Sequence, residues 1–281
     1  MTTASEAAPD GKGEIATPAS TRRALLEGQR RGYTAVRSVL VQLPEADERG
    51  GRAGVLARFV HERRHHALLA YLLLLGSFPE IHERREPLSS AVWVRALTGS
   101  DPACPTWTAS TLSRTWGVLE DMGLISRCRR ARLVDVQPRR EDGQQDYAPP
   151  VGGKSWEETY FVVPDQFWTE GLFSKLSLPA LAMFLLLLKE TNKRPEFHIT
   201  FDQVEQWYGI TRRSAQNGIA QLKTLNIISS RDQRVAAPLA PSGTTTHIYY
   251  QLTGPYSTAA RNDLRRLARA ARSEHVPGSD Q

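Results

Sequence analysis

Cysteine, lysine and long hydrophobic runs are scarce in this sequence, and each scarcity excludes a class of protein. Only Cys104 and Cys128 are cysteines among the 281 residues, which excludes a disulfide framework and a zinc site built mainly from thiolates. The longest uncharged apolar run has thirteen residues, between Lys175 and Lys189, whereas a membrane-spanning helix needs about 18 or more. The N-terminus lacks the cationic start and apolar run of a secretory signal. We therefore expect a cytoplasmic protein with no membrane partner.

Basic charge is concentrated in two segments of the chain. The net charge is +6 at pH 7, and since six of the 36 basic residues are lysine, arginine supplies the other 30. A GC-rich genome produces such a composition in any protein, so the total alone indicates no partner. Residues 125–140 hold six arginines and one acid, and residues 257–275 hold five arginines and two acids. The two segments together carry +8, so the rest of the chain is slightly acidic, and the clustering is the informative feature.

The chain contains an internal repeat of helix patterns. A leucine-rich segment, 68–75 in the first copy and 181–188 in the second, predicts a buried helix. A shorter helix follows, with a hydroxyl residue as its N-cap, Ser89 or Ser90 in one copy and Thr200 in the other. A third helix then aligns without gaps at an offset of 103 residues, with apolar positions stepping by four, three and three along one helix face. Leu112, Trp116, Leu119 and Met122 match Ala215, Ile219, Leu222 and Leu225.

Each third helix leads into a pattern typical of two strands. In the first copy a strand over 125–137 leaves the helix, a polar loop follows, and a strand over 158–163 returns. In the second copy residues 227–234 go out and residues 246–252 come back. Three helices followed by a two-stranded hairpin are thus predicted twice.

This order of elements, together with the shared helix exit Leu-x-x-[Met/Leu]-x-[Leu/Ile]-Ile-Ser, resembles the winged-helix module of bacterial DNA-binding proteins. The module is a helix-turn-helix with a β-hairpin wing, and the resemblance covers about residues 60–252. It implies a mainly α fold with small β-hairpin wings, of the α+β class, made of two winged helix-turn-helix modules in tandem. We accordingly predict a disordered tail (1–20), an N-terminal helical extension or linker (21–51, with a helix over 22–42), a first module with a long basic wing (52–166), a second module (167–256) and a basic C-terminal helix and tail (257–281).

The resemblance also implies which residues would meet DNA. In a helix-turn-helix the second helix enters the major groove and its N-terminal residues meet base edges, where arginine pairs with guanine and asparagine or glutamine with adenine. The second copy places there Thr211, Arg212, Arg213, Gln216 and Asn217. The first copy places there Thr108, Ser110, Ser113 and Arg114, whose hydroxyls suit phosphates as well as bases. A solvated helix face would have a similar composition.

The arginines of the first wing imply a grip on the DNA backbone. A basic hairpin beside a groove-bound helix would hold phosphates or enter a minor groove, unless its charge reflects codon usage alone. The residues concerned are Arg127, Arg129, Arg130, Arg132, Arg139 and Arg140. We expect base reading mainly by the second copy and phosphate binding mainly by this wing. The C-terminal helix (259–272) would pack on the second module, form a homodimer contact or lie along DNA.

Catalytic and cofactor motifs are not convincing in this sequence. His61-Glu62-Arg63-Arg64-His65 matches the H-E-x-x-H string of zinc proteases, but its two arginines would repel a cation and no third ligand follows at helical spacing. A solvated, charged segment just before the first leucine-rich helix is the better interpretation of this string.

The tryptophans also have a structural explanation, since Trp93, Trp116 and Trp207 fall at helical core positions. We expect no metal, no cofactor and no enzymatic activity.

Three roles remain for a protein of this kind. A transcription regulator that binds double-stranded DNA is favoured, at the nucleoid of a bacterial cytoplasm. A replication initiator of a plasmid or mobile element, binding origin repeats, is the first alternative, because such initiators also resemble tandem winged helices. A protein-interaction scaffold of a chromosome-organising complex is the second alternative, although the arginine clusters of this chain argue against that role.

Overall fold

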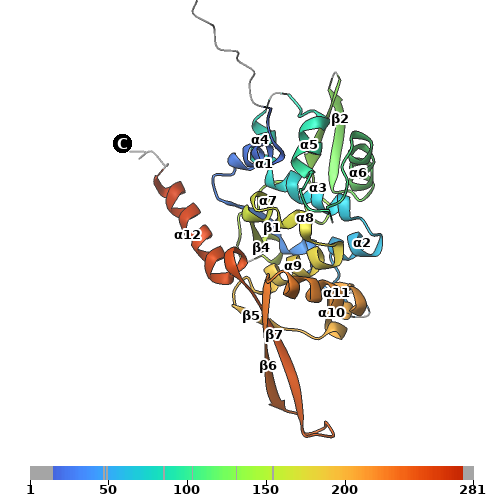
Figure 1. Cartoon of the computed structure of the whole chain (residues 1–281), viewed down its shortest axis with the longest axis vertical. Helices are drawn as coiled ribbons and strands as arrows, with labels where there is room; N and C mark the ends of the chain where they lie inside the picture. Colours follow the sequence, from blue (N-terminus) through green and yellow to red (C-terminus); the bar gives the residue numbers. More distant parts are fainter. Residues whose placement is uncertain are drawn as a thin grey trace, which may run out of the picture.

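A computed structural model describes residues 15–46, 48, 50–84, 86–102, 104–130, 132–153 and 155–274, and the chain is of the α+β class (Figure 1). Helices dominate, and the strands in these ranges form small antiparallel sheets of two or three strands. Residues 1–14 of the predicted tail and residues 275–281 of the predicted C-terminal segment lie outside the described residues. In the ranges described, no helix combines the length and the apolar character needed to cross a membrane.

Both halves of the chain contain the three predicted helices and a hairpin, and the first half also contains a short helix, α4 (Phe78–Glu83), that was not predicted. The first half contains α3 (His65–Gly76), α4 (Phe78–Glu83), α5 (Ser90–Leu97), α6 (Ala109–Asp121), β2 (Ile125–Arg130) and β3 (Leu133–Pro138). The second contains α9 (Leu178–Glu190), β5 (Glu196–His198), α10 (Phe201–Tyr208), α11 (Arg212–Thr224), β6 (Ile228–Ala236) and β7 (Thr244–Leu252). Both ends of α6 and α11 differ by the predicted offset of 103. The short strand β5, which pairs with β7, was not predicted.

Helix starts follow the predicted capping residues. The Thr108 and Thr211 hydroxyls each accept a hydrogen bond from the backbone amide three residues on, at the starts of α6 and α11. Thr200 forms a capping box with Gln203 at the start of α10. Gly209 then ends α10 with φ +64°, a left-handed conformation that glycine adopts without strain. These caps satisfy amides that have no partner inside the helix.

The predicted helix over 22–42 is wrong beyond its first turns. Helix α1 (Pro18–Glu27) ends at Gly28, Arg30 and Gly32 have positive φ, and the chain continues as β1 (Tyr33–Arg37) and the short helix η1 (Ser38–Leu40). Closely spaced glycines and a left-handed residue break the helix. Every residue of β1 is buried, so its apolar run serves a strand covered on both faces.

The predicted pairing of the first wing is also wrong. Strand β4 (Tyr160–Pro164) does not return to residues 125–137 but pairs antiparallel with β1. The wing is instead the tight hairpin β2–β3, with Arg130 opposite Leu133. Because Phe161 and Val163 are buried on one face of the strand and Val162 on the other, β4 needs cover on both faces, which an exposed wing cannot supply.

One continuous core connects the two halves. The β1–β4 pair lies between them (Figure 1), α9 packs against β4 and α11, and α2 (Val55–His61) contacts both α3 and α9. The short helices α7 (Gln166–Thr169), α8 (Leu172–Lys175), η2 (Trp156–Glu158) and η3 (Gly254–Tyr256) complete the connections. Trp93 and Trp116 are buried as predicted and meet edge to face at 5.5 Å. Trp207 is only half-buried.

Helix α12 (Thr258–Glu274) is anchored by a buried arginine. Arg261 is 0% exposed and donates hydrogen bonds to the carbonyls of Tyr256, Leu188 and Thr191. Two of these carbonyls belong to the C-terminal end of α9, where a cation also complements the helix dipole. Burial, followed by repulsion from Arg265, lowers the pKa of Arg261 to about 9, so the side chain is charged at neutral pH.

The remainder of α12 packs on β1 and β4 through one face. Leu264 and Ala268 lie against Tyr33, Ala35 and Val162, which belong to the predicted extension and first module and not to the second module on which the helix was expected to pack. Leu267, predicted to share this face, is 63% exposed. The helix therefore covers the central strand pair and projects outward at its end (Figure 1).

Replacing Arg261 should destabilise the fold because the carbonyls of Leu188 and Thr191 would each lose a buried donor, and the Thr191 carbonyl would be left with the Thr258 hydroxyl. We expect Arg261→Met to lower the free energy of unfolding by about 2–4 kcal/mol, measured by urea denaturation followed by circular dichroism. The matched control is Arg266→Met, because Arg266 is exposed and pairs only with Asp263; its effect should stay within about 0.5 kcal/mol. Equal effects of the two changes would contradict the anchoring role.

Candidate nucleic-acid interface

Helix α11 packs closely against α9 at the point where the two helices cross. Its buried residues are Ala215, Gly218, Ile219 and Leu222. A Cβ atom added to Gly218 would lie 2.5 Å from the carbonyl oxygen of Pro179, so only glycine permits this approach. The Gln221 side chain also accepts from the Ser177 amide and donates to the Lys175 carbonyl. One face of α11 is thus fully used in packing.

The opposite face of α11 presents four of the five predicted reading residues to solvent. Arg212, Arg213, Gln216 and Asn217 are exposed, whereas Thr211 serves as the N-cap. Arg212 is ion-paired with Asp202 at 2.7 Å and Glu205 at 3.1 Å, both on α10. Arg213 makes no ion pair with any residue in the described ranges. The face therefore offers one uncommitted guanidinium and two amide side chains.

Helix α6 presents a smaller and less charged face. Thr108, Ser110, Ser113 and Arg114 are exposed, as predicted for the first copy. Thr108 is occupied as N-cap, and the Arg114 side chain donates to the Ser110 carbonyl at 3.4 Å. A Cβ at Gly117 would meet nothing within 4 Å. Backbone or phosphate groups of a partner can approach such a face closely.

A basic recess of about 560 Å³ beside α6 was missed by sequence reasoning. It brings Arg63 and Arg64, which precede α3, next to Thr111 and Arg114 of α6. Arg63 has φ +56°, so the chain turns sharply there. The only sequence signal was the charged string His61–His65, which we interpreted as a solvated lead-in.

The H-E-x-x-H string does not lie on one helix. His61 is the last residue of α2, and His65 is the first of α3. The His61 Nε2 atom lies 2.7 Å from the Gly209 carbonyl oxygen. Among the residues that the structure describes, no group of three or more histidine, cysteine or acidic side chains is arranged to hold a metal.

The first wing offers less free charge than its composition indicates. Arg127 is ion-paired with Glu120, and Arg130 pairs with Asp135 at 3.1 Å. Arg129 and Arg132 are exposed and have no ion pair with any described residue. Two of the four hairpin arginines can therefore meet a partner while every ion pair of the wing stays intact.

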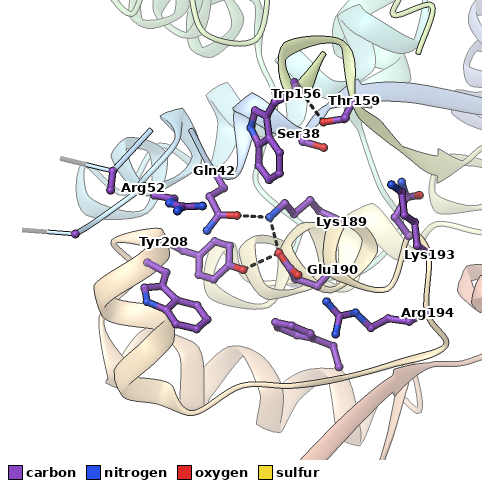
Figure 2. A pocket seen from close by; sticks show the side chains of 15 residues that line it. Ser38, Gln42, Arg52, Trp156, Thr159, Lys189, Glu190, Lys193, Arg194 and Tyr208 are labelled. Carbon is purple, nitrogen blue, oxygen red and sulfur yellow. Dashed lines mark hydrogen bonds and ion pairs between the residues drawn. The ribbon is translucent and has the colours of Figure 1, made fainter. Parts of the chain in front are cut away.

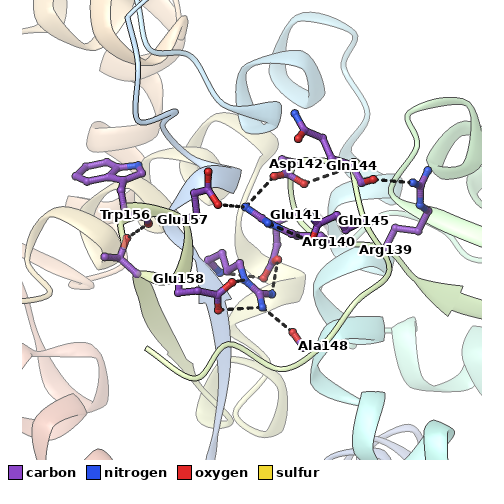
Figure 3. A network of polar contacts seen from close by, with 12 residues as sticks. Arg139, Arg140, Glu141, Asp142, Gln144, Gln145, Ala148, Trp156, Glu157 and Glu158 are labelled. Atoms are coloured by element: carbon purple, nitrogen blue, oxygen red, sulfur yellow. Dashed lines mark hydrogen bonds and ion pairs between the residues drawn. The ribbon is translucent and has the colours of Figure 1, made fainter. Parts of the chain in front are cut away.

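Arg139 and Arg140 do not lie on the wing, which corrects the sequence prediction for both. Arg140 is buried and pairs with Asp142 at 3.1 Å and Glu157 at 3.6 Å (Figure 3). Nearby, Arg37 of β1 pairs with the buried carboxylate of Glu141 at 3.1 Å and with Glu158 at 3.2 Å. A buried charge needs such partners. Arg37 therefore fastens Glu141 and Glu158 to β1, and Arg140 holds Asp142 and Glu157 together.

The hairpin β6–β7 is longer than the hairpin β2–β3. Strands β6 and β7 pair over nine residues each and project away from the body (Figure 1). On it, Arg231 pairs with Glu196 and lies 4.4 Å from the Tyr249 ring centre, while Arg234 is exposed without an ion pair among the described residues. The His198 ring of β5 stacks on the His247 ring of β7 at 4.1 Å. Sequence reasoning assigned no site residue to this hairpin.

Helices α6 and α11 lie along one edge of the molecule as drawn in Figure 1. In the view of Figure 1, α6, α2 and α11 follow one another along the same edge, and the hairpins β2–β3 and β6–β7 extend toward opposite ends. Comparison of the chain with known protein families, curated proteins and solved structures found no match. Any proposal about function therefore rests on the geometry of the chain.

The recess beside α6 includes a histidine that burial keeps neutral. Desolvation, followed by repulsion from His66, lowers the pKa of His65 to about 4, and its buried Nε2 has no hydrogen-bond partner. Unfolded chains bind a proton at histidine near pH 6.5, so the stability that His65 contributes should be complete above that pH and be lost as the pH drops toward 4. Burial raises the pKa of Asp165 to about 7, which changes stability with the opposite sign over the same window, so the His65 contribution is the difference between the wild-type and His65→Gln profiles. We expect this difference to be on the order of 1–3 kcal/mol, measured by urea denaturation at several pH values. Exposed His82→Gln should reproduce the wild-type profile; a wild-type profile in the His65 variant would refute the assignment.

Proposed function

We propose that this chain is a tandem winged-helix protein that binds double-stranded DNA in a sequence-specific way and acts as a transcription regulator. The observation that carries the proposal is the exposed face of α11, with Arg213, Gln216 and Asn217 set on a rigid helix just after the short helix α10. A helix of this length is about 20 Å long and fits the major groove of B-DNA. A bacterial protein with this role would act at the nucleoid.

The ion pairs revise which side chains would read bases. Arg213, Gln216 and Asn217 have no intramolecular charge partner to give up, and each can make a two-point contact with guanine or adenine. Arg212 is held by two exposed carboxylates of α10. Exposed pairs are worth about 0–1 kcal/mol, and these acids would otherwise repel phosphates, so Arg212 screens them at the interface.

Phosphate binding is shared among three places in this proposal. Arg129 and Arg132 on the first wing, Arg234 on the second, and Arg63 and Arg114 in the recess beside α6 are exposed cations. Contacts of this kind position a protein on DNA without reading its sequence. Their spread over the length of the chain supports a long DNA footprint.

The replication-initiator role is the second candidate, and one observation favours it. The two reading helices in a single chain are unequal, since α11 carries arginine and amides while α6 carries hydroxyls and one arginine. A single chain of this kind suits an asymmetric site, which can be repeated in one direction. A palindrome requires instead a two-fold symmetric dimer.

Loss of the α11 side chains should remove sequence discrimination. Bound sequences are first selected from a random duplex pool, and affinities for the selected and a scrambled duplex are then compared by fluorescence anisotropy. We expect Arg213→Ala and Asn217→Ala each to reduce the preference by about 1–3 kcal/mol, because alanine cannot form the bidentate hydrogen bonds to a base. Arg84→Ala on α4, which removes a cation paired with Glu80, is the control and should change neither affinity. An unchanged preference in both α11 variants would refute reading by this helix.

Loss of the free wing arginines should weaken binding to all sequences alike. We expect Arg129→Ala combined with Arg132→Ala to reduce the slope of log affinity against log salt by about one for each phosphate that is no longer neutralised. Arg130→Ala, which removes an arginine already paired with Asp135, should have a smaller effect. Absence of binding to any duplex at low salt would reject DNA binding and favour the protein-interaction scaffold.

A further inference from the structure

A large open cavity lies where α9 ends. It has a volume of about 710 Å³ and is bounded by α9, α10, the segment after β1 and the short helix η2 (Figure 2). This size falls within the range of small-molecule sites in proteins. Neither the reading faces nor the wings include any part of it.

Positive charge dominates the charged side chains of the cavity. Among the residues that the structure describes, Arg52, Lys189, Lys193 and Arg194 line it, against the carboxylate of Glu190. Lys189 is 8% exposed and donates to Gln42 and Glu190, and the Tyr208 hydroxyl donates to Glu190 at 2.6 Å. The carboxylate is thus already shared by two donors.

The remaining cations have no such partner. Arg52, Lys193 and Arg194 are exposed and make no ion pair with any residue that the structure describes. Figure 2 shows Arg52 at one end of the cavity, and Lys193 and Arg194 at the other. Three cations without a carboxylate partner around one concave space attract an anion, and arginine is suited to phosphate because its planar fork can donate two parallel hydrogen bonds.

Aromatic rings supply a second kind of contact in the same space. Trp156 is 37% exposed, and its ring lies 5.4 Å from the Lys189 ammonium; Tyr208 lies at the same distance on another side. Trp207 of α10 is half-buried and also lines the cavity. Large aromatic faces left open in a concave, cationic site are suited to stacking against a flat ring.

We propose that this cavity binds a nucleotide, with the phosphate held by Lys193 and Arg194 and the base placed against the tryptophan rings. Lys189, Glu190, Tyr208 and Gln42 form its polar floor. Arg52 adds a second cation at the opposite end. Because Trp207 and Tyr208 belong to α10, a bound nucleotide would touch the helix that precedes α11. A change in DNA affinity on nucleotide binding is a consequence that rests on the proposed function.

The test is titration of the full chain, without DNA, by isothermal calorimetry with AMP, GMP, CMP, UMP and ATP. Adenosine and inorganic phosphate are titrated in parallel. We expect saturable binding of at least one nucleotide, at least tenfold tighter than either adenosine or phosphate. Lys193→Ala combined with Arg194→Ala should weaken it at least tenfold, as should Trp156→Ala, whereas Trp156→Phe should retain most of the affinity. Arg84→Ala should change nothing.

Several outcomes would overturn the proposal. These are no binding of any nucleotide at millimolar concentration, phosphate binding as tightly as the nucleotides, and wild-type affinity in the Lys193 and Arg194 variant. Binding of single-stranded oligonucleotides without mononucleotides would also overturn it. That result would point to the neighbouring groove, which shares Lys193 and is lined by Arg265 and Arg266. Because these titrations contain no duplex, a failure of double-stranded DNA binding leaves their result unaffected.

Discussion

Helix α9 is apolar around almost its whole circumference, and the need to cover it on every side organises the molecule. Ten of its residues are buried, so no face of the helix can be left to water. Helix α11 covers one side, β4 another, and α2 and β7 add to these. Its C-terminal carbonyls are satisfied by Arg261, which brings in α12. Elements from both halves of the chain therefore meet on one helix.

The sequence was sufficient for the repeated helices because their signals are local. Thr108 and Thr211 cap the helices they precede, and the apolar spacing in between identifies their buried faces. The pairing of β1 with β4 joins residues about 127 positions apart, from Tyr33↔Pro164 to Arg37↔Tyr160. Strand partners so distant leave no mark in either segment, and residues 33–37 were accordingly predicted as part of a helix, since a short segment buried on all sides fits either element. The nearest returning strand was therefore chosen for the wing, and that choice was wrong.

Charge patterns predicted the interface only in part because ion pairing depends on the fold. Arg129 and Arg130 are neighbours in sequence, but only Arg130 has a carboxylate partner, on the facing strand. Arg140 reads as a wing cation and is buried between Asp142 and Glu157. Arg63 reads as a solvated helix lead-in and lines a recess beside α6. The basic clusters indicated which segments carry positive charge. Which of their arginines are free of ion pairs could be identified only from the contacts that the fold creates.

Through α9, the close approach at Gly218 connects α11 with the floor of the cavity. With no room for a side chain between α11 and α9, the position of α11 is set directly by the backbone of α9. The same helix ends at Lys189 and Glu190 in the floor of the cavity. One helix therefore carries the contact with α11 near its start and part of the cavity floor at its end.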